Sequence, residues 1–413
     1  MRTAILAAML ATGTAAFAAE PPNAELISII EQQQQQIEQM QQQLDAQRDA
    51  LESLRQQVQQ NVAATEEVNQ KAEILAENIE EQPAVAQSDT TIGGYGELHV
   101  NLLEDQRSDA EKNEIDFHRF VLFFNHEFND RLRFVSELEL EHALSGDDQP
   151  GEIELEQAYV EYDLAQQHSL RAGLFLVPVG IINETHEPPT FYGVERNPVE
   201  NRIIPTTWWE AGVSFTGSFA DALRYDAALH SGLETDAGSN YAIRSGRQKV
   251  AKAGFDSQAY TGRLRWLGVP GLELSASLQY QDDVTQENDP LAGSAWLYTG
   301  HLAWQYGVFG LRALYARWSL DGPGPEALGA DRQDGWYVEP SWRFNEHWGV
   351  FARYNVWDNQ AGNSTDTEYT QVDLGVNYWL HPNVVFKLDY QDQDAPAGKA
   401  EMDGWNLGVG YMF

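Results

Sequence analysis

The chain of 413 residues contains no cysteine, which excludes disulfides, thiolate nucleophiles and thiolate metal sites. It is also poor in positive charge, because 26 lysines and arginines stand against 63 acidic residues and give a formal net charge of −37. Such a chain cannot neutralise a row of phosphates, so we expect no nucleic-acid partner. After the first 19 residues no apolar run approaches the length of a membrane-spanning helix. The sequence therefore excludes a helical membrane protein.

Signatures of catalysis are missing as well. There is no G-x-S-x-G or phosphate-binding glycine loop, and His186-Glu187 is followed by two prolines instead of completing an H-E-x-x-H motif. We therefore expect no enzymatic activity, no cofactor and no metal centre.

The N-terminus has the pattern of a secretory signal. Arg2 precedes an apolar run from Ala4 to Ala19, and Ala16-Phe17-Ala18 fits a small-x-small cleavage site. Residues 1–18 are therefore predicted to be a signal peptide, with a buried N-terminal helix as the alternative. The mature chain is expected to work outside the cytoplasm, in the periplasm or outer membrane of a Gram-negative cell.

Residues 25–82 differ from everything that follows. Fourteen of the residues from 31 to 60 are glutamine, and the segment has no glycine or aromatic residue. Apolar residues recur at sevenfold spacing, with a second row three residues later, which predicts an α-helical coiled coil. The first row is Ile30, Ile37, Leu44, Leu51, Val58, Ala72 and Ile79. The alternative is a solvated glutamine-rich spacer. Pro83 ends the predicted helix, and residues 83–90 are expected to be a linker.

From residue 91 onward the apolar period becomes two, which is typical of strands with one apolar and one polar face. Sixteen such segments can be recognised, near 92–102, 114–126, 130–142, 152–164, 167–177, 208–218, 222–232, 254–267, 271–282, 294–306, 308–320, 333–344, 347–358, 368–380, 383–393 and 402–413. Short turns alternate with long connections, of which 103–113 and 178–207 are examples. This alternation is typical of an up-and-down barrel with two unequal rims.

The polar faces carry too many charged groups for a packed core, so we expect the apolar faces to meet lipid. Aromatic residues near the short turns fit an interfacial girdle: Trp266, Trp304, Tyr306, Trp342, Phe344, Trp348, Tyr378, Trp379 and Tyr411. The predicted fold class is all-β. Residues 91–413 form a 16-stranded antiparallel transmembrane β-barrel, preceded by the N-terminal α-helical coiled coil.

Two neighbouring segments resemble a known family. They are Gln157-Ala-Tyr-Val-Glu-Tyr162 and Leu170-Arg-Ala-Gly-Leu-Phe-Leu-Val-Pro-Val-Gly180. Together with the terminal Tyr411-Met-Phe413, they resemble the phosphate-selective porin O and P family of Gram-negative outer membranes. Members of that family concentrate lysines and arginines along the conduction path. This chain differs, because its barrel region has only five lysines: Lys112, Lys249, Lys252, Lys387 and Lys399.

Assigning the polar faces strand by strand predicts pore-lining residues of both signs. They are Arg119, Arg133, Glu137, Glu139, Arg171, Arg224, Arg263, Arg343, Arg353, Asp373 and Lys387. Two interpretations stay open: the charges neutralise each other in the wall, or they lie on opposite sides and create a transverse field.

The connection 178–207 is the longest, and it is rich in proline and apolar residues. We expect it to fold against the inner wall as a constriction loop, with a position over the rim or against a neighbouring subunit as the alternative. Its candidate gate residues are Glu184, Glu187, Glu195, Arg196, Glu200 and Arg202.

The expected function is passive diffusion of small hydrophilic solutes and ions through a water-filled porin, with the coiled coil in the periplasm. The expected partners are further copies of the chain in a homo-oligomer, most simply a trimer, and outer-membrane lipid and lipopolysaccharide. The alternatives are an anion- or phosphate-selective channel, and a structural tether that acts through the coiled coil.

Overall fold

The computed structural model describes residues 89–413, which form one closed barrel of sixteen strands. The strands are β1 Thr90–Asp105, β2 Glu111–Asn129, β3 Leu132–Glu141, β4 Ile153–Ala165, β5 His168–Leu176, β6 Trp209–Ala220, β7 Leu223–His230, β8 Ala259–Val269, β9 Leu272–Gln281, β10 Ala295–Tyr306, β11 Phe309–Leu320, β12 Arg332–Trp342, β13 Trp348–Asp358, β14 Tyr369–His381, β15 Val384–Asp394 and β16 Met402–Met412. Short helical elements lie only in the long connections of this part of the chain: η1 Ile182–Glu184, η2 Pro188–Thr190, η3 Val199–Ile203, η4 Ala237–Ser239, η5 Ile243–Gly246 and α2 Pro323–Leu328. Within the same residues, no helix is long and apolar enough to cross a bilayer.

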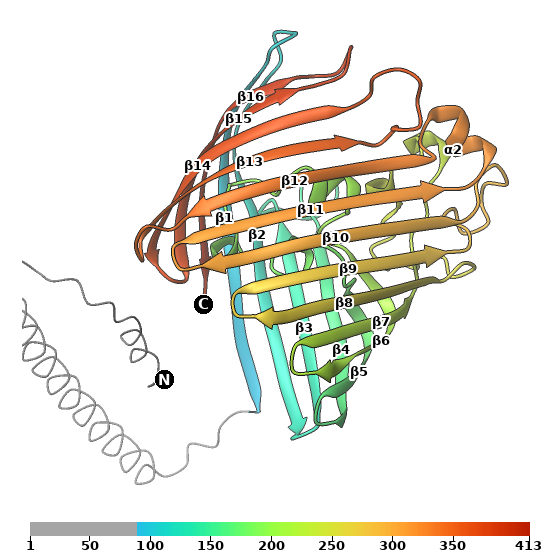
Figure 1. The fold of residues 1–413 in the computed structure, drawn as a ribbon, viewed down its shortest axis with the longest axis vertical. Helices are drawn as coiled ribbons and strands as arrows, with labels where there is room; N and C mark the ends of the chain where they lie inside the picture. Colours follow the sequence, from blue (N-terminus) through green and yellow to red (C-terminus); the bar gives the residue numbers. More distant parts are fainter. Residues whose placement is uncertain (1–88) are drawn as a thin grey trace, which may run out of the picture. The chain divides into compact units, whose positions relative to one another are not determined.

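Every strand pairs antiparallel with its neighbours in sequence, and β1 pairs with β16 to close the ring (Figure 1). The closing register places Tyr95 opposite Met412 and Asp105 opposite Met402. Closure leaves no unpaired sheet edge, which is what a bilayer demands of a β-structure. The predicted number of strands and the antiparallel order are confirmed.

Alternation of side chains divides each strand between two environments. On β9, Leu274 and Leu278 are about 40% exposed on the outer face, whereas Ser277 and Gln279 are buried on the inner face. The same pattern repeats around the ring, so a band of leucine, valine and aromatic side chains faces outward. This apolar outer surface with a polar interior is the arrangement of a transmembrane barrel.

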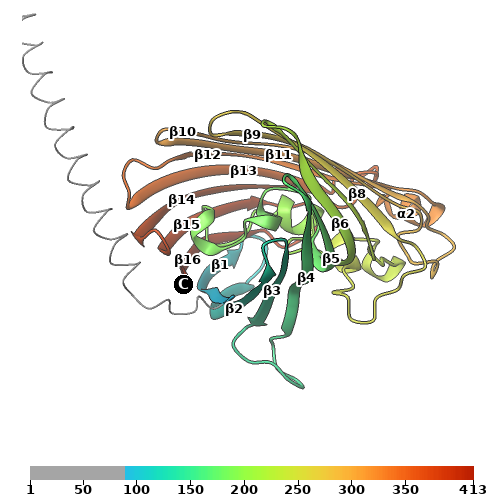
Figure 2. The same ribbon diagram turned by 90° about the horizontal axis from the view of Figure 1, so that it is seen from below.

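Part of the interior is nevertheless apolar. Two long connections, 177–208 and 231–258, fold inward and pack against inward side chains of β10–β12. The resulting cluster includes Ile203 and Trp208 from the first connection, Leu233 and Ile243 from the second, and Trp318 from the wall, all fully buried. Figure 2 shows the first connection inside the ring of strands. The expectation that the charged inner faces leave no packed core inside the barrel is therefore wrong for this part of the interior.

Three further details differ from prediction. The connection 103–113 is mostly strand, because Leu102 pairs with Asn113 and Glu104 with Glu111, which leaves a turn of 106–110. Trp379 does not belong to an outer girdle, since it is 4% exposed and its ring lies against Tyr192 inside the barrel. The predicted signal peptide, coiled coil and linker lie outside the described residues, apart from the last two positions of the linker.

Candidate functional site

The connection 177–208, which we call the luminal loop, is attached to the barrel wall on both sides of the β1–β16 closure. On the β2 side, Arg119 donates from Nη2 to the carbonyl oxygen of His186 at 2.8 Å. On the β15 side, Lys387 donates from Nζ to the carbonyl of Gly193 at 2.8 Å. Both side chains were predicted to line the pore. The structure places them on the inner face, where they hold the loop backbone.

Other predicted inward residues form buried ion pairs. Arg353 lies between Glu339 at 3.1 Å and Asp373 at 3.0 Å, and is itself 5% exposed. Arg263 pairs with Asp226 at 2.8 Å and with Glu184 of the luminal loop. An unpaired buried charge is costly, and here the opposite charges neutralise each other.

The predicted arginines near the short turns have different surroundings. Arg133 and Arg171 share the carboxylate of Glu161, and both side chains are about one third exposed. Arg224 is exposed at the end of β7. Arg343 lies over the ring of Trp379, with 4.1 Å between its Cζ and the ring centroid.

The acidic residues of the luminal loop are mostly anchors. Glu200 is fully buried, and its carboxylate accepts hydrogen bonds from the amides of Ile181 at 2.5 Å and Ile182 at 2.8 Å and from the Tyr337 hydroxyl at 2.8 Å. Glu200 was predicted as a gate residue, but it faces the inside of the loop.

Glu195 attaches the loop to β1, through His99 Nδ1 at 3.2 Å and Asn101 Nδ2 at 3.0 Å. Burial alone would raise the pKa of Glu195, but His99 and Asn101 hold it well below its usual range. Of the remaining candidates, Arg202 is exposed, and the half-buried Glu187 carboxylate has no hydrogen-bond partner among residues 89–413.

A polar cavity of about 110 Å³ lies between these loops and the β1–β4 wall. The wall contributes the carboxylates of Glu97, Glu139, Glu141, Glu154 and Glu156. The luminal loop contributes Arg196, and the connection 231–258 contributes Arg244 and Arg247. Carboxylates therefore predominate on the wall side and guanidinium groups on the loop side. The exceptions are Arg119 of the wall, which pairs with Glu97, and Glu195 of the loop, which accepts from His99 and Asn101.

Loop carbonyls hold Arg244 and Arg247, and no carboxylate of residues 89–413 forms an ion pair with either of them. Arg244 donates to the carbonyls of Asn201 at 3.0 Å and Thr206 at 3.1 Å, and Arg247 donates to that of Thr207 at 2.7 Å. Burial and the neighbouring guanidinium groups lower the pKa of Arg244 to about 9. The cluster thus carries positive charge that no contacting carboxylate neutralises.

Arg244 and Arg247 were missed by the sequence reasoning, which assigned residues only on strands and in the luminal loop. The local sequence feature that could have indicated an arginine cluster is the Arg-Ser-Gly-Arg spacing of these two residues. No periodic pattern shows that the connection 231–258 turns inward.

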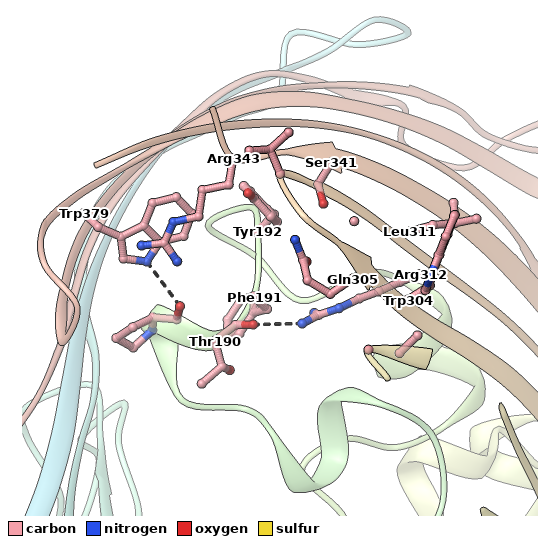
Figure 3. Close-up of a pocket in the computed structure, with 15 residues that line it drawn as sticks. Thr190, Phe191, Tyr192, Trp304, Gln305, Leu311, Arg312, Ser341, Arg343 and Trp379 are labelled. Atoms are coloured by element: carbon pink, nitrogen blue, oxygen red, sulfur yellow. Dashed lines mark hydrogen bonds between the residues drawn. The ribbon is translucent and has the colours of Figure 1, made fainter. Parts of the chain in front are cut away.

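A second cavity, of about 500 Å³, lies at the short-turn end between the luminal loop and β9–β12. Its lining includes Gln305, Arg312, Ser341 and Arg343 of the wall and Tyr192 of the loop (Figure 3). Arg312 donates to the carbonyl of Thr190 at 2.8 Å, drawn as a dashed line in Figure 3. A chamber with both polar and apolar lining thus lies on this side of the loop as well.

Comparison with known proteins places this architecture in a family. Residues 90–411 match the family described as phosphate-selective porin O and P. An uncharacterised protein of Aquifex aeolicus strain VF5 is 32% identical over 354 residues, covering 78% of this chain and 80% of the relative.

Solved outer-membrane barrels share the fold at low sequence identity. Salmonella typhi OmpF, in complex with daunomycin, is 14% identical with a TM-score of 0.57, over 78% of this chain and 97% of that one. The anion-selective porin of Comamonas acidovorans is 13% identical with a TM-score of 0.55, over 78% and 99%. The trimer form of Vibrio cholerae OmpT is 13% identical with a TM-score of 0.53, over 78% and 99%.

The closed barrel with an apolar exterior, the inward-folded loop between β5 and β6 and the match over residues 90–411 lead to one conclusion. The chain belongs to the phosphate-selective porin O and P family and is an outer-membrane porin for passive diffusion.

Proposed function

We propose that solutes pass this porin through the polar cavity between the loop arginines and the β1–β4 wall. The observation that carries the proposal is the separation of charge across that cavity. Arg196, Arg244 and Arg247 lie on the loop side, and Glu139 and Glu141 are among the carboxylates on the wall side. A field across a narrow opening orients dipolar solutes, and it need not exclude either sign of ion. The preferred solutes are then small, hydrophilic and zwitterionic or dipolar.

Selectivity for anions is the second candidate. It is favoured by the three loop arginines, since Arg244 and Arg247 donate to backbone carbonyls. The further arginines Arg312 and Arg343 in the chamber at the short-turn end also favour it. Guanidinium groups suit phosphate and carboxylate solutes because they donate two hydrogen bonds in one plane. The net charge of −37 on the whole chain opposes anion selectivity, because it repels anions that approach the protein.

The test is the reversal potential of single channels in a planar bilayer under a salt gradient. Wild-type protein is expected to conduct with a reversal potential near zero. Arg244→Gln with Arg247→Gln should shift it toward cation selectivity, and Glu139→Gln with Glu141→Gln toward anion selectivity. The control is Arg317→Gln, which changes an exposed arginine on the outer face of β11. If both double variants conduct with the wild-type reversal potential, the proposed route is wrong.

A strongly anion-selective wild-type channel that phosphate blocks would instead establish the second candidate. In that case the loop arginines would be its binding groups, and the double arginine variant should lose the block.

The proposal includes the assembly expected from the sequence. We infer a homotrimer in a Gram-negative outer membrane, in contact with lipopolysaccharide, with residues 25–82 forming a periplasmic coiled coil. The heptad pattern of those residues supports it, as does the trimer form of a solved barrel with the same fold. In this assembly the barrel has no enzymatic role, and the coil holds protomers together.

A further inference from the structure

Three histidines and an aspartate gather on the inner wall beside the polar cavity, at the long-loop end. All ten histidines of the chain fall in the described part, so the neighbourhood of each is known. The rings of His99 and His118 stack at 4.5 Å between centroids, and those of His118 and His142 meet edge to face at 5.8 Å. Asp116 lies between His118 and His142. His99 also attaches the luminal loop through Glu195, whereas the contacts among Asp116, His118 and His142 are separate from the loop attachments described above.

A β-bulge brings these side chains together. The pairing of β1 with β2 runs from Glu97–Arg119 directly to His99–Asp116, so two residues of β2, Phe117 and His118, stand opposite one residue of β1. Asp116 faces inward beside His99, and Arg119 faces inward beyond the bulge. Strict alternation from Arg119 would send Asp116 and His118 outward, and for that reason the sequence did not reveal the cluster.

His142 reaches the cluster from the end of β3. Its backbone amide donates to the carbonyl of His118 at 3.2 Å, and its φ of 50° lies in the left-handed region, where histidine is enriched among residues other than glycine. This bond joins the chain that follows β3 to β2 and turns the imidazole toward Asp116.

We propose that Asp116, His118 and His142 bind a divalent first-row transition metal ion, with Zn²⁺ as the representative. One donor atom from each residue lies within 4.8 Å of the others. His142 Nδ1 is 2.8 Å and His118 Nδ1 3.3 Å from the same oxygen of Asp116. Two ligands of a tetrahedral ion, each about 2.0–2.1 Å from it, lie roughly 3.3 Å apart, so small side-chain rotations suffice.

The chemistry of the donors selects the kind of ion. Two imidazoles and a carboxylate suit zinc, copper and nickel, whereas Mg²⁺ and Ca²⁺ prefer sets of oxygen ligands. The site is open to solvent, because His118 and His142 are each 34% exposed in their side chains and Asp116 is 21% exposed. The fourth ligand position is then available to water. A cluster held only by hydrogen bonds between histidine and aspartate is the competing explanation.

Calorimetric titration of the full-length porin in detergent with ZnCl₂ tests the proposal. We expect one Zn²⁺ per chain, which excess Mg²⁺ or Ca²⁺ does not displace. His118→Ala and His142→Ala should each weaken binding by at least about a hundredfold, since loss of a group that only supports a ligand already costs 10–100-fold. His381→Ala, an exposed histidine at the opposite end of the barrel, is the matched control and should bind as wild type.

Paramagnetic resonance of the protein loaded with Cu²⁺ gives a readout that does not depend on affinity. The wild-type spectrum should show coupling to two imidazole nitrogens, and each histidine variant should show one. Asp116→Asn, which keeps the shape of the side chain, should also weaken Zn²⁺ binding. Zn²⁺ binding that survives in both histidine variants, displacement by Ca²⁺, or a spectrum without imidazole nitrogens would overturn the proposal.

Discussion

At the scale of single residues, the same carboxylate chemistry performs different tasks according to burial. Glu200 and Glu187 lie in one loop, and the sequence reasoning placed both in the gate. In the structure, the carboxylate of Glu200 receives two backbone amides and a tyrosine hydroxyl in full burial, whereas that of Glu187 has no hydrogen-bond partner in residues 89–413. Sequence spacing cannot distinguish them, because burial of a loop residue depends on where the loop folds.

Glu200→Gln is predicted to destabilise the porin by about 1–3 kcal/mol. The amide has the size of the carboxylate but loses its charge. When its oxygen accepts from the Ile181 and Ile182 amides, its NH₂ group stands where the second carboxylate oxygen accepts from the Tyr337 hydroxyl and Asn197 Nδ2, and it cannot accept from them. Urea unfolding in detergent micelles measures the change. Glu187→Gln is the control and should stay within about 0.5 kcal/mol of wild type. Equal effects of the two substitutions would refute the anchoring role of Glu200.

At the scale of elements, strand boundaries follow well from period-two alternation, and most predicted strands agree with the structure to within two residues. The apolar residues of the luminal loop also predicted its contact with the inner wall. Three features escape such reasoning: the bulge at Phe117 and His118, the inward fold of the connection 231–258, and the arginines that this connection carries. Each depends on contacts between segments distant in sequence, so no local pattern specifies it.

The attachment of the luminal loop to the wall is predicted to weaken at alkaline pH. His186 lies in the loop, 3.2 Å from Glu137 and 3.5 Å from Glu156, with Arg119 and the ring of Tyr95 also packed against it. Burial alone would lower the pKa of His186, but the two carboxylates raise it to about 10.

Because this value lies above the unfolded value of about 6.5, the stabilisation is complete below pH of about 6.5 and is lost as the pH rises through about 10. The unfolding temperature of wild type should therefore fall over this interval by more than that of His186→Gln. Parallel curves for the two proteins would contradict the prediction.

At the scale of the whole molecule, the sequence predicted the barrel, its outward apolar faces and its family, because lipid contact imposes the same alternation on every strand. It did not predict an apolar core inside the barrel. The side chains of that core come from four connections and the four strands β10–β13, and each group alone resembles ordinary loop or wall sequence.

Deletion of residues 25–82 is predicted to leave conduction intact and to weaken the trimer. Every group of the proposed solute route lies in the barrel, whereas the heptad pattern lies in the deleted segment. Planar-bilayer recordings should show the wild-type conductance per channel, and light scattering in detergent should show a larger share of monomer. A deletion variant that folds but does not conduct would show that the segment is part of the channel itself.

The apolar core also limits how this channel can close. Val199, Ile203, Ile204, Leu233 and Ile243 are fully buried between the two loops and the wall. Returning one such side chain to water costs about 1.5–3 kcal/mol, so swinging the loops out of the barrel would cost on the order of 10 kcal/mol. At equilibrium an ejected state would then be populated roughly once in ten million molecules. Current through this porin is consequently expected to fluctuate through movements of individual arginine and glutamate side chains, while the two loops stay in place inside the barrel.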